Sequence, residues 1–269
     1  MAASDKAFTG SVPTIYERYM VPFNFAPYAV DLAARLAALK PRDVLEIAAG
    51  TGALTVELLR QLPRDTAIIA TDLNQAMLDV AATKLPHGAV TLRACDAMQL
   101  ALPDQSFDAV ACQFGVMFLP DKAAGFRGIR RVLRPGGRFL FSVWDDLQSN
   151  VLSAVVEAAV AKAFPNDPPA FFRRTPFGYH DQAAITATLR EAGFSDVVAE
   201  TVTLPSRAPS AEHVAIAICQ GTPLRGEIEQ RAPGRLAEIT GLAQEAVAAA
   251  HGSGPVEAPM QALVFEAVA

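Results

Sequence analysis

Acidic residues stand at the ends of three successive apolar runs that read as buried strands. Glu46 lies near the end of the first run, Asp72 closes the second, and Asp96 follows the third. Neighbouring strands of a parallel sheet present their carboxyl ends along one edge, where ligands bind in such folds. We therefore expect the three carboxylates to gather at one edge and to favour a neutral or positively charged ligand.

A loop with two glycines joins the first run to a helical pattern. Its sequence is Ala48-Ala49-Gly50-Thr51-Gly52. Glycine permits the unusual backbone angles of a sharp turn from strand to helix, and it lets a ligand approach the main chain and the helix N-terminus. A dinucleotide fingerprint would place a third glycine where the chain has Thr55. No Lys or Arg lies between residues 46 and 57 to hold a phosphate.

The position of Asp72 indicates the kind of ligand. It follows Gly52 by about 20 residues, the spacing at which an acidic group accepts hydrogen bonds from the ribose hydroxyls of an adenosine. A ribose-binding acid, two further carboxylates and the missing phosphate clamp together favour a nucleoside that carries positive charge. S-adenosylmethionine, with a sulfonium, a ribose, an adenine and an amino acid tail, is such a ligand.

Several segments, taken in order, resemble the motif series of class I S-adenosylmethionine-dependent methyltransferases. They are Val44–Gly52, Thr71–Leu78, Cys95–Ala97, Leu102-Pro103, Ser106–Asp108 and Val132–Gly137. The resemblance covers roughly residues 40–145 and is closest to the small-molecule branch that includes the quinone-biosynthesis (type 11) methyltransferases. It implies an enzyme that takes a methyl group from S-adenosyl-L-methionine and leaves S-adenosyl-L-homocysteine.

The resemblance also implies which residues bind the donor. For the methionine and ribose portions, Glu46 would orient the amino group, Gly50, Thr51 and Gly52 would approach both portions, and Asp72 would hold the ribose hydroxyls. For the adenine, Leu73 and Met77 would lie against the ring, and Asp96 and Ala97 would read its amino edge. Gln113 and Phe114 would face the amino acid tail, and Tyr16 would close over that tail. Ala48 departs from the usual pattern, because the first glycine of the loop ordinarily stands there. The alternative for each acidic residue is a solvated strand cap.

The elements that position these residues alternate between strand and helix. Strands are predicted at Asp43–Ile47, Ala67–Asp72, Val90–Ala94, Phe107–Gln113, Arg138–Trp144, Val197–Val202 and Gln261–Glu266. Helices are predicted at Ala53–Leu62, Gln75–Lys84, Lys122–Leu133, Leu152–Phe164 and Gln182–Ala192, and the first three are followed by Pro63, Pro86 and the turn Pro135-Gly136-Gly137. The pattern is typical of an α/β protein with a doubly wound, seven-stranded, mostly parallel sheet, which is the Rossmann-like fold of the methyltransferases.

The parts of the chain outside the donor motifs are less regular. We divide the chain into an N-terminal aromatic and helical cap (1–40), a donor-binding core (41–145), a helix and loop insertion (146–180), a core continuation (181–205), a helical insertion (206–257) and a final core strand (258–269). Insertions of this length usually have a function, and we expect them to form a lid. Their aromatic residues favour a small, hydrophobic or aromatic acceptor, although a packed satellite core would have the same composition.

Composition argues against several other classes of protein. The 269 residues carry a net charge of −5 with a pI near 5.4, so no overall positive field favours nucleic acid. Three cysteines without a C-x-x-C pair argue against a disulfide framework and against a zinc site, and no metal is expected. The chain shows neither a secretory pattern nor an apolar run long enough for a membrane span, so we expect a cytoplasmic protein.

The sequence leaves the acceptor chemistry and the oligomeric state open. A sulfonium is already a good leaving group, so a general base is needed only if the acceptor arrives protonated. His180 and His213 are the candidate bases, although a lone histidine is more often a surface or satisfied core residue. Two other classes stay open: a non-catalytic donor-binding sensor or assembly module, and an NAD-linked oxidoreductase, which Thr55 and the missing phosphate clamp disfavour.

Overall fold

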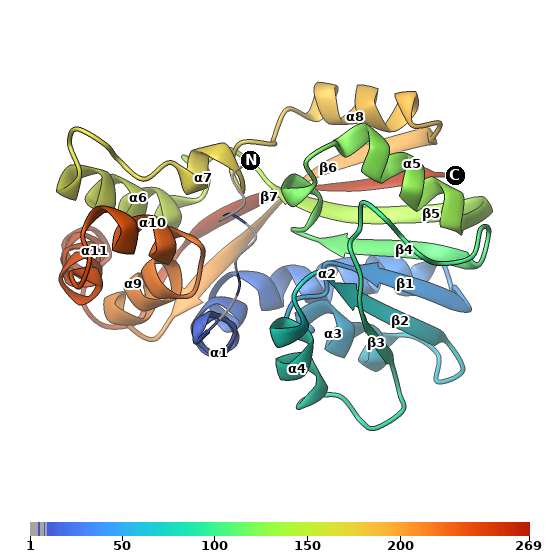
Figure 1. Cartoon of the computed structure of the whole chain (residues 1–269), viewed down its shortest axis with the longest axis horizontal. Helices are drawn as coiled ribbons and strands as arrows, with labels where there is room; N and C mark the ends of the chain where they lie inside the picture. The colour runs from blue at the N-terminus through green and yellow to red at the C-terminus, as the bar shows by residue number, and fades with distance from the viewer. Residues whose placement is uncertain (1–4, 6–7, 9) are drawn as a thin grey trace. The chain divides into compact units, whose positions relative to one another are not determined.

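The computed structural model describes residues 5, 8 and 10–269, which form two compact units. The helical unit comprises the residues up to Pro27, Asp145–Gly178 and Thr203–Gln261. The sheet unit comprises Tyr28–Trp144, Tyr179–Val202 and Ala262–Ala269. Each unit is therefore assembled from three separate stretches of the chain, and the colours of Figure 1 allow these stretches to be followed. The cap, core and insertions expected from the sequence divide the chain more finely, and that division stays a prediction.

Helices and strands alternate through the sheet unit, and helices dominate the other unit. The helices are α1 (Val12–Ile15), the π-helix η2 (Tyr16–Phe25), α2 (Ala26–Ala38), α3 (Ala53–Gln61), α4 (Gln75–Ala82), the 3-10 helix η3 (Val116–Phe118), α5 (Lys122–Val132), α6 (Val151–Ala163), α7 (Phe171–Arg174), α8 (Gln182–Glu191), α9 (Ala211–Gln220), α10 (Leu224–Arg231) and α11 (Leu236–His251). The strands are β1 (Asp43–Ile47), β2 (Ala67–Asp72), β3 (Thr91–Ala94), β4 (Phe107–Gln113), β5 (Leu133–Trp144), β6 (Ser195–Ala208) and β7 (Val256–Val268).

The seven strands form one sheet in the order β3-β2-β1-β4-β5-β7-β6. The pairs β1–β2, β1–β4, β2–β3 and β4–β5 are parallel, whereas β7 runs antiparallel to β5. The prediction of a doubly wound, seven-stranded, mostly parallel sheet is confirmed. The strand order reverses between β1 and β4, and the crevice beyond the carboxyl ends of strands at such a point is where these folds bind ligands.

Helices cover both faces of the sheet. On one face, Leu32 of α2 and Leu58 of α3 belong to a buried cluster that also contains Leu140 of β5. On the opposite face, Phe126 of α5 packs against Phe141 of β5, with ring centroids 5.8 Å apart. Successive strand residues point to opposite faces, which explains how positions 140 and 141 reach different helices. Burial on both faces also explains the nearly continuous apolar sequences of β1 and β4.

Several predicted helix boundaries differ from the structure by one or two residues. α3 ends at Gln61, because Leu62 precedes Pro63 and takes an extended conformation with φ −81° and ψ 156°. α5 ends at Val132 and α4 at Ala82, each shorter than predicted. The chain before α2, predicted only as an aromatic cluster, forms the π-helix η2 with Pro22 inside it. Helices of this type are rare, so the sequence pattern did not predict it.

Strand β5 is longer than predicted and includes Pro135-Gly136-Gly137, which were expected to form a turn. It begins at Leu133 instead of Arg138, and Gly136 within it takes a positive φ of 77°. The register of β5 against β4 shifts between Phe107 and Ala109, so the extra residues form an irregular part of the strand. A turn sequence and a bulge both need glycine, which is why Pro135-Gly136-Gly137 read as a turn.

Strands β6 and β7 also exceed their predicted ranges, because each continues past a proline. Pro205 lies in β6, which is an edge strand of the sheet. Pro259 lies in the part of β7 that precedes Ala262, where the pairing of β7 with β5 begins. Prolines at these positions remove no hydrogen bond from the β5–β7 ladder.

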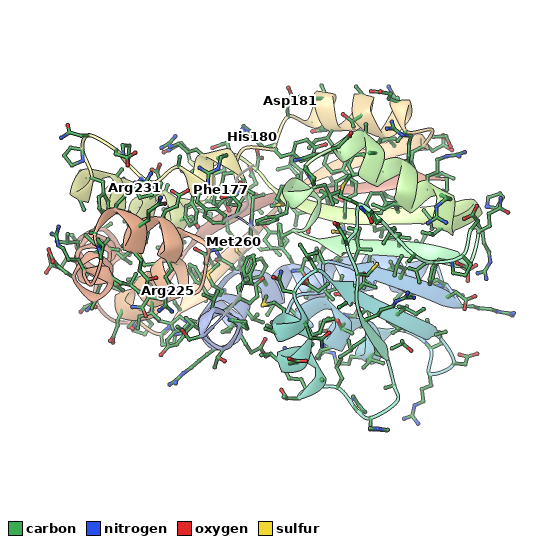
Figure 2. All side chains as sticks on the ribbon, in the orientation of Figure 1. Phe177, His180, Asp181, Arg225, Arg231 and Met260 are labelled. Atoms are coloured by element: carbon green, nitrogen blue, oxygen red, sulfur yellow. The ribbon has the colours of Figure 1, made fainter. Side chains whose placement is uncertain are left out.

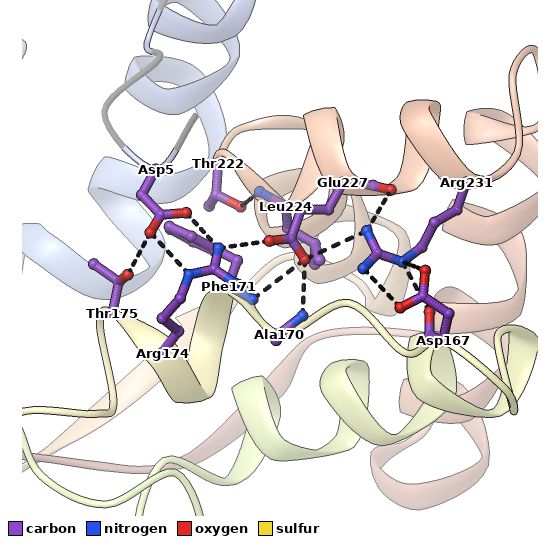
Figure 3. Close-up of polar contacts among 10 residues, drawn as sticks. All are labelled: Asp5, Asp167, Ala170, Phe171, Arg174, Thr175, Thr222, Leu224, Glu227 and Arg231. Atoms are coloured by element: carbon purple, nitrogen blue, oxygen red, sulfur yellow. Dashed lines mark hydrogen bonds and ion pairs between the residues drawn. The ribbon is translucent and has the colours of Figure 1, made fainter. Parts of the chain in front are cut away.

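A buried ionic network joins separate stretches of the helical unit (Figure 3). Arg174 of α7 donates from Nε to Oδ2 of Asp5 at 3.0 Å and from Nη2 to Oε1 of Glu227 at 2.6 Å. Glu227 of α10 also accepts from the backbone N–H of Ala170 at 2.8 Å and pairs with Arg231 at 3.8 Å. Only 1% of Asp5 and 8% of Glu227 is exposed. The network therefore links α7 and α10 to Asp5 through buried carboxylates, which would be strongly destabilising without their cationic partners.

Within residues 5, 8 and 10–269, no helix is long and apolar enough to cross a membrane. The expected cellular location stays a prediction.

Candidate functional site

Glu46, at the carboxyl end of β1, is a buried carboxyl group. It is 1% exposed, and its Oε2 accepts a hydrogen bond of 2.7 Å from the hydroxyl of Thr55 on α3. The hydroxyl of Thr71 on β2 donates to the Glu46 backbone carbonyl at 3.0 Å, which fixes the main chain at this position. Burial raises the pKa of Glu46 to about 8, although the Thr55 hydrogen bond acts in the opposite direction.

Asp72, at the carboxyl end of β2, holds the glycine loop and the start of α4. Its Oδ2 accepts from the backbone N–H of Gly50 at 2.8 Å, and its Oδ1 accepts from that of Asn74 at 2.8 Å. Burial raises the pKa of Asp72, and the N–H groups of Asn74 and Gly50 oppose this rise because they stabilise the carboxylate. The structure thus brings Asp72 into contact with the loop, and the role of Asp72 in binding a ribose stays a prediction.

The loop between β1 and α3 has a strained backbone. Ala48, Gly50 and Gly52 have φ values of 54°, 56° and 82°. This left-handed region costs glycine little, whereas at Ala48 the side chain makes it unfavourable. Thr51 is 1% exposed, and its Oγ1 is a buried atom without a hydrogen-bond partner. A buried hydroxyl in that state is an unusual feature that a ligand at this loop would relieve.

Gly115, after β4, is matched to Ala48. A Cβ atom at Gly115 would lie 2.5 Å from Cβ of Ala48 and 2.6 Å from Sγ of Cys112. The alanine that departs from the usual loop pattern therefore occupies space beside a residue without a side chain. The sequence alone did not indicate this pairing, because the two positions are far apart in the chain.

Gly115→Ala is expected to destabilise the protein by about 1–3 kcal/mol, because the new methyl group overlaps Cβ of Ala48 and the buried Sγ of Cys112. Ala48→Gly alone should change stability by less than about 1 kcal/mol, since relief of left-handed strain is offset by a more flexible unfolded chain. The double variant should recover part of the loss, because it removes one of the two clashing atoms. Urea unfolding of the four proteins measures this coupling. A double variant as unstable as the sum of the single changes would contradict it.

The residues predicted to contact the adenine follow strands β2 and β3. Leu73 is 47% exposed, which is unusual for a large apolar side chain beside a buried loop. Met77 of α4 is 3% exposed, and a Cβ at Gly50 would lie 3.5 Å from its Cε, so its side chain lies against the loop. Asp96 and Ala97 follow β3 and are half-buried, and Oδ1 of Asp96 accepts from the backbone N–H of Met98 at 2.9 Å.

The end of β4 also has an unusual backbone. Gln113 is half-buried, and Phe114 after it has a φ of 52°. The Phe114 ring stacks on Trp144 with centroids 3.8 Å apart and meets the edge of Tyr28 at 5.3 Å. Strained positions of non-glycine residues cluster at functional sites, where the surrounding packing maintains them. These rings provide such packing beside the strand ends.

Three other predicted site residues lie outside this group. Tyr16 begins η2 in the helical unit, where its ring lies 5.1 Å from that of Phe25. His213, also in the helical unit, contacts the backbone carbonyl of Tyr19 through Nε2 at 3.0 Å. His180 is exposed on the segment before α8, next to Asp181 (Figure 2). Since a carbonyl only accepts, Nε2 of His213 must carry a proton, and only its Nδ1 could act as a base.

The strand-end residues of the sheet unit fit a cationic nucleoside. Two buried carboxyl groups can each form an ion pair with a cationic ligand, an exposed leucine offers an apolar surface for a flat ring, and the loop supplies close backbone approach beside an unpartnered hydroxyl. Along residues 46–57 no lysine or arginine is present to bind a phosphate. The arrangement can bind and orient a ligand, whereas no strong nucleophile is evident among these residues.

Comparisons with known proteins identify the family. The family described as "Methyltransferase domain" matches residues 45–141. The "Ubiquinone/menaquinone biosynthesis C-methyltransferase UbiE" of Pseudomonas aeruginosa is 33% identical over 173 residues, which cover 60% of this chain and 68% of that protein. The chain belongs to the class I S-adenosylmethionine-dependent methyltransferases. The predictions of the family, of a methyltransferase and of S-adenosyl-L-methionine as its methyl donor are confirmed.

Other relatives of this methyltransferase agree. The UbiE protein of Marinomonas sp. is 32% identical over 164 residues, covering 56% of this chain and 65% of its own length. The fold is similar to that of the phosphoethanolamine N-methyltransferase 2 of Haemonchus contortus in complex with S-adenosyl-L-methionine, with a TM-score of 0.63 and 17% identity, covering 100% of this chain and 60% of that one. At this identity the second comparison supports the fold alone.

Sequence reasoning missed the contact that Thr55 makes in this methyltransferase. Thr55 was noted only as the residue that replaces the third glycine of a dinucleotide fingerprint. Its buried hydroxyl instead donates to Glu46. The available signal was a residue with a hydroxyl group in the first turn of the helix that follows a strand ending in a buried acid.

Proposed function

We propose that this methyltransferase transfers the methyl group of S-adenosyl-L-methionine to a carbon atom of a small quinol ring. The observation that carries the proposal is the 33% identity to a protein whose name states C-methylation in ubiquinone and menaquinone biosynthesis. The family match over residues 45–141 includes the strand-end residues described above. A quinol is also small and aromatic, as expected of the acceptor from the sequence.

The donor-binding roles predicted from the sequence become part of this proposal. Glu46 would bind the ammonium group of the donor, and Asp72 would bind its ribose hydroxyls. We assign the other parts of the donor as follows. The methionine and ribose would contact Gly50, Thr51 and Gly52, and the adenine would contact Leu73, Met77, Asp96 and Ala97. The amino acid tail would contact Gln113 and Phe114 and would be covered by Tyr16. The unpartnered hydroxyl of Thr51 and the exposed side chain of Leu73 support a ligand at this edge.

The chemistry requires little covalent help from the protein. The sulfonium of the donor supplies an electrophilic methyl carbon and a good leaving group. The residues of the chain have to hold the donor, align the acceptor carbon with the methyl group and exclude water, and such positioning can lower a barrier by about 7–11 kcal/mol. A ring carbon next to a hydroxyl becomes a nucleophile once that hydroxyl loses its proton. Attack on the methyl carbon breaks its bond to sulfur and leaves S-adenosyl-L-homocysteine, and the ring carbon then loses its own hydrogen as a proton, which restores the aromatic ring. His180 and Nδ1 of His213 are the proposed candidates for removing it.

The aromatic residues of the 146–180 insertion do not add support for an aromatic acceptor. Phe171, Phe172 and Phe177 are 2%, 5% and 7% exposed. Their ring centroids lie 5.7 and 5.5 Å apart in sequence order, so they pack together as a core. The alternative explanation of the composition, a packed satellite core, therefore accounts for these residues. The lid role of the insertions and the absence of nucleic acid partners stay predictions.

Methyl transfer to a panel of acceptors tests the proposal. The protein is incubated with methyl-labelled donor and a 1,4-naphthoquinol or benzoquinol that lacks a ring methyl group, with a catechol and phosphoethanolamine for comparison. We expect label on a ring carbon of a quinol, identified by the carbon-13 chemical shift of the transferred methyl group, which differs between a C-methyl group and a methyl ether. Transfer only to a catechol oxygen or to the amine would overturn the quinol assignment.

A second candidate is a donor-binding sensor or assembly module without catalysis. It is favoured by one observation: among the residues described at the strand ends, none provides an evident base, and Nε2 of His213 is engaged by a backbone carbonyl. Binding of S-adenosyl-L-homocysteine, with no transfer to any acceptor of the panel, would support this candidate.

A further inference from the structure

We propose that Thr55 is a positioning residue of the donor site: its hydroxyl aims the Glu46 carboxyl group, and through this contact the uptake of the donor is coupled to the loss of a proton from Glu46. The proposal rests on the donor-binding role proposed above for Glu46. It adds a residue with no assigned role and a dependence of donor affinity on pH.

The hydrogen-bond acceptor of the Thr55 hydroxyl is not the one that is usual for a threonine in a helix. A threonine within a helix commonly donates to a backbone carbonyl of the preceding turn. Thr55 instead donates to Oε2 of Glu46 at 2.7 Å and is 0% exposed. Its Oγ1 lies 3.5 Å from where a Cβ at Gly52 would be, so the contact forms directly beneath the glycine loop. One oxygen of Glu46 is thereby fixed, and we assign the other to the ammonium group of the donor.

The surroundings of Glu46 are poor in positive charge. Asp72 on β2 interacts unfavourably with an ionised Glu46, and Lys84 after α4 provides the opposing attraction. Beyond the effect of burial, an ionised Glu46 in turn raises the pKa of Cys112 on β4, which therefore stays a neutral thiol. Burial raises the pKa of Glu46 to about 8 and that of Cys112 to about 12. Without ligand, Glu46 is therefore largely protonated at neutral pH, and Thr55 is the side chain that stabilises its ionised form by a hydrogen bond.

A bound ligand with an ammonium group reverses this balance. A positive charge next to Glu46 favours the carboxylate, so the pKa of Glu46 is lower in the complex than in the free protein. Binding then releases a proton at any pH between these two pKa values. By linkage, affinity rises as pH rises through this range and becomes constant above the pKa of the free protein. Below the range the affinity is constant and low.

Calorimetric titration with S-adenosyl-L-homocysteine tests the proposal, because this product carries the same ammonium group and undergoes no reaction. For the wild-type protein, we expect affinity to rise about tenfold between pH 6.5 and 8.0, and buffers with different ionisation enthalpies should show close to one proton released per ligand bound at pH 7.0. Glu46→Gln cannot ionise, so its affinity should be flat over this range and its proton release close to zero. That variant also corrects for any titration of the ligand itself.

Thr55→Val keeps the shape of the side chain and removes the hydroxyl. We expect about tenfold weaker binding at pH 7.0 and a displacement of the pH profile to higher pH, because the carboxylate has lost its hydrogen bond. Thr55→Ser should restore the affinity and the profile. A purely structural role would lower the affinity of Thr55→Val equally at every pH, and this result would overturn the proposal. A flat profile for the wild-type protein would do the same.

The test separates this inference from the proposed function. Binding of S-adenosyl-L-homocysteine with no pH dependence leaves the donor site intact and refutes only the role of Thr55. If the wild-type protein does not bind this ligand at any pH, the donor site itself has been misplaced and both proposals fail.

Discussion

Asp72→Ala is expected to weaken binding of S-adenosyl-L-homocysteine by about 10- to 150-fold, which corresponds to about 1.5–3 kcal/mol. The carboxylate is proposed to accept hydrogen bonds from the ribose hydroxyls, and hydrogen bonds to charged groups have this magnitude. Asp72 also holds the backbone N–H groups of Gly50 and Asn74 at 2.8 Å each. Its removal therefore disturbs the loop that approaches the donor as well as the ribose contact.

Calorimetry measures the affinity, and thermal unfolding without ligand shows whether the variant is folded. Asp79→Ala is the matched control, because Asp79 is an exposed acid on the neighbouring α4 whose side chain bonds only to Gln75 among the contacts described. It removes the same formal charge and should bind the ligand as the wild type does. If folded Asp72→Ala and Asp79→Ala bind with equal affinity, the ribose has been assigned to the wrong residue.

Arg174→Ala is expected to destabilise the helical unit by about 2–3 kcal/mol, less than the cost of removing one partner from a fully buried ion pair, because the Arg174 side chain is itself 30% exposed. The Asp5 and Glu227 carboxyl groups are almost completely buried, and Arg174 donates to both. The substitution removes a cationic donor from both buried carboxyl groups, and Glu227 keeps the more distant Arg231 at 3.8 Å. Arg174→Lys retains the charge without the planar fork, so its effect should be intermediate.

Urea unfolding, combined with amide hydrogen exchange of α7 and α10, measures this loss. The neighbouring Arg173 provides the control: it pairs with Glu157 at 2.6 Å, but its side chain is 61% exposed. Arg173→Ala should cost less than about 1 kcal/mol, because water screens an exposed pair. Equal losses for Arg173→Ala and Arg174→Ala would show that the network does not stabilise the unit.

Features encoded by neighbouring residues could be predicted from the sequence. The strands β1, β2 and β4 were found with their observed bounds, because an uninterrupted apolar run next to a turn signal is sufficient evidence. The shared edge of Gly50 and Asp72 could be predicted, since parallel strands place their carboxyl ends together, whereas the hydrogen bond between them could not. The π-helix η2 could not be predicted because helices of this type are rare, and the continuation of β6 and β7 past prolines depends on pairing between strands distant in the sequence.

Side-chain pairs between distant positions could not be predicted in the same way. The fit of Gly115 to Ala48 and the stacking of Phe114 on Trp144 require the completed sheet. The bond from Thr55 to Glu46 joins residues only nine positions apart, yet a hydroxyl group has several possible acceptors within its own helix. Which acceptor the hydroxyl uses depends on which groups are buried beside it, and the sequence pattern does not indicate this.

The place of β7 in the sheet has a consequence for biosynthesis. Its residues Ala262–Val268 pair with β5, and β7 separates β5 from β6. Strands β1 to β6 are therefore synthesised before β7, which lies between β5 and β6 in the sheet, emerges from the ribosome. Until then, β5 and β6 each present an open edge, the kind of surface that joins strands of other chains. Nascent chains halted before residue 262 should consequently depend on chaperones to avoid aggregation, whereas full-length chains can close this gap themselves.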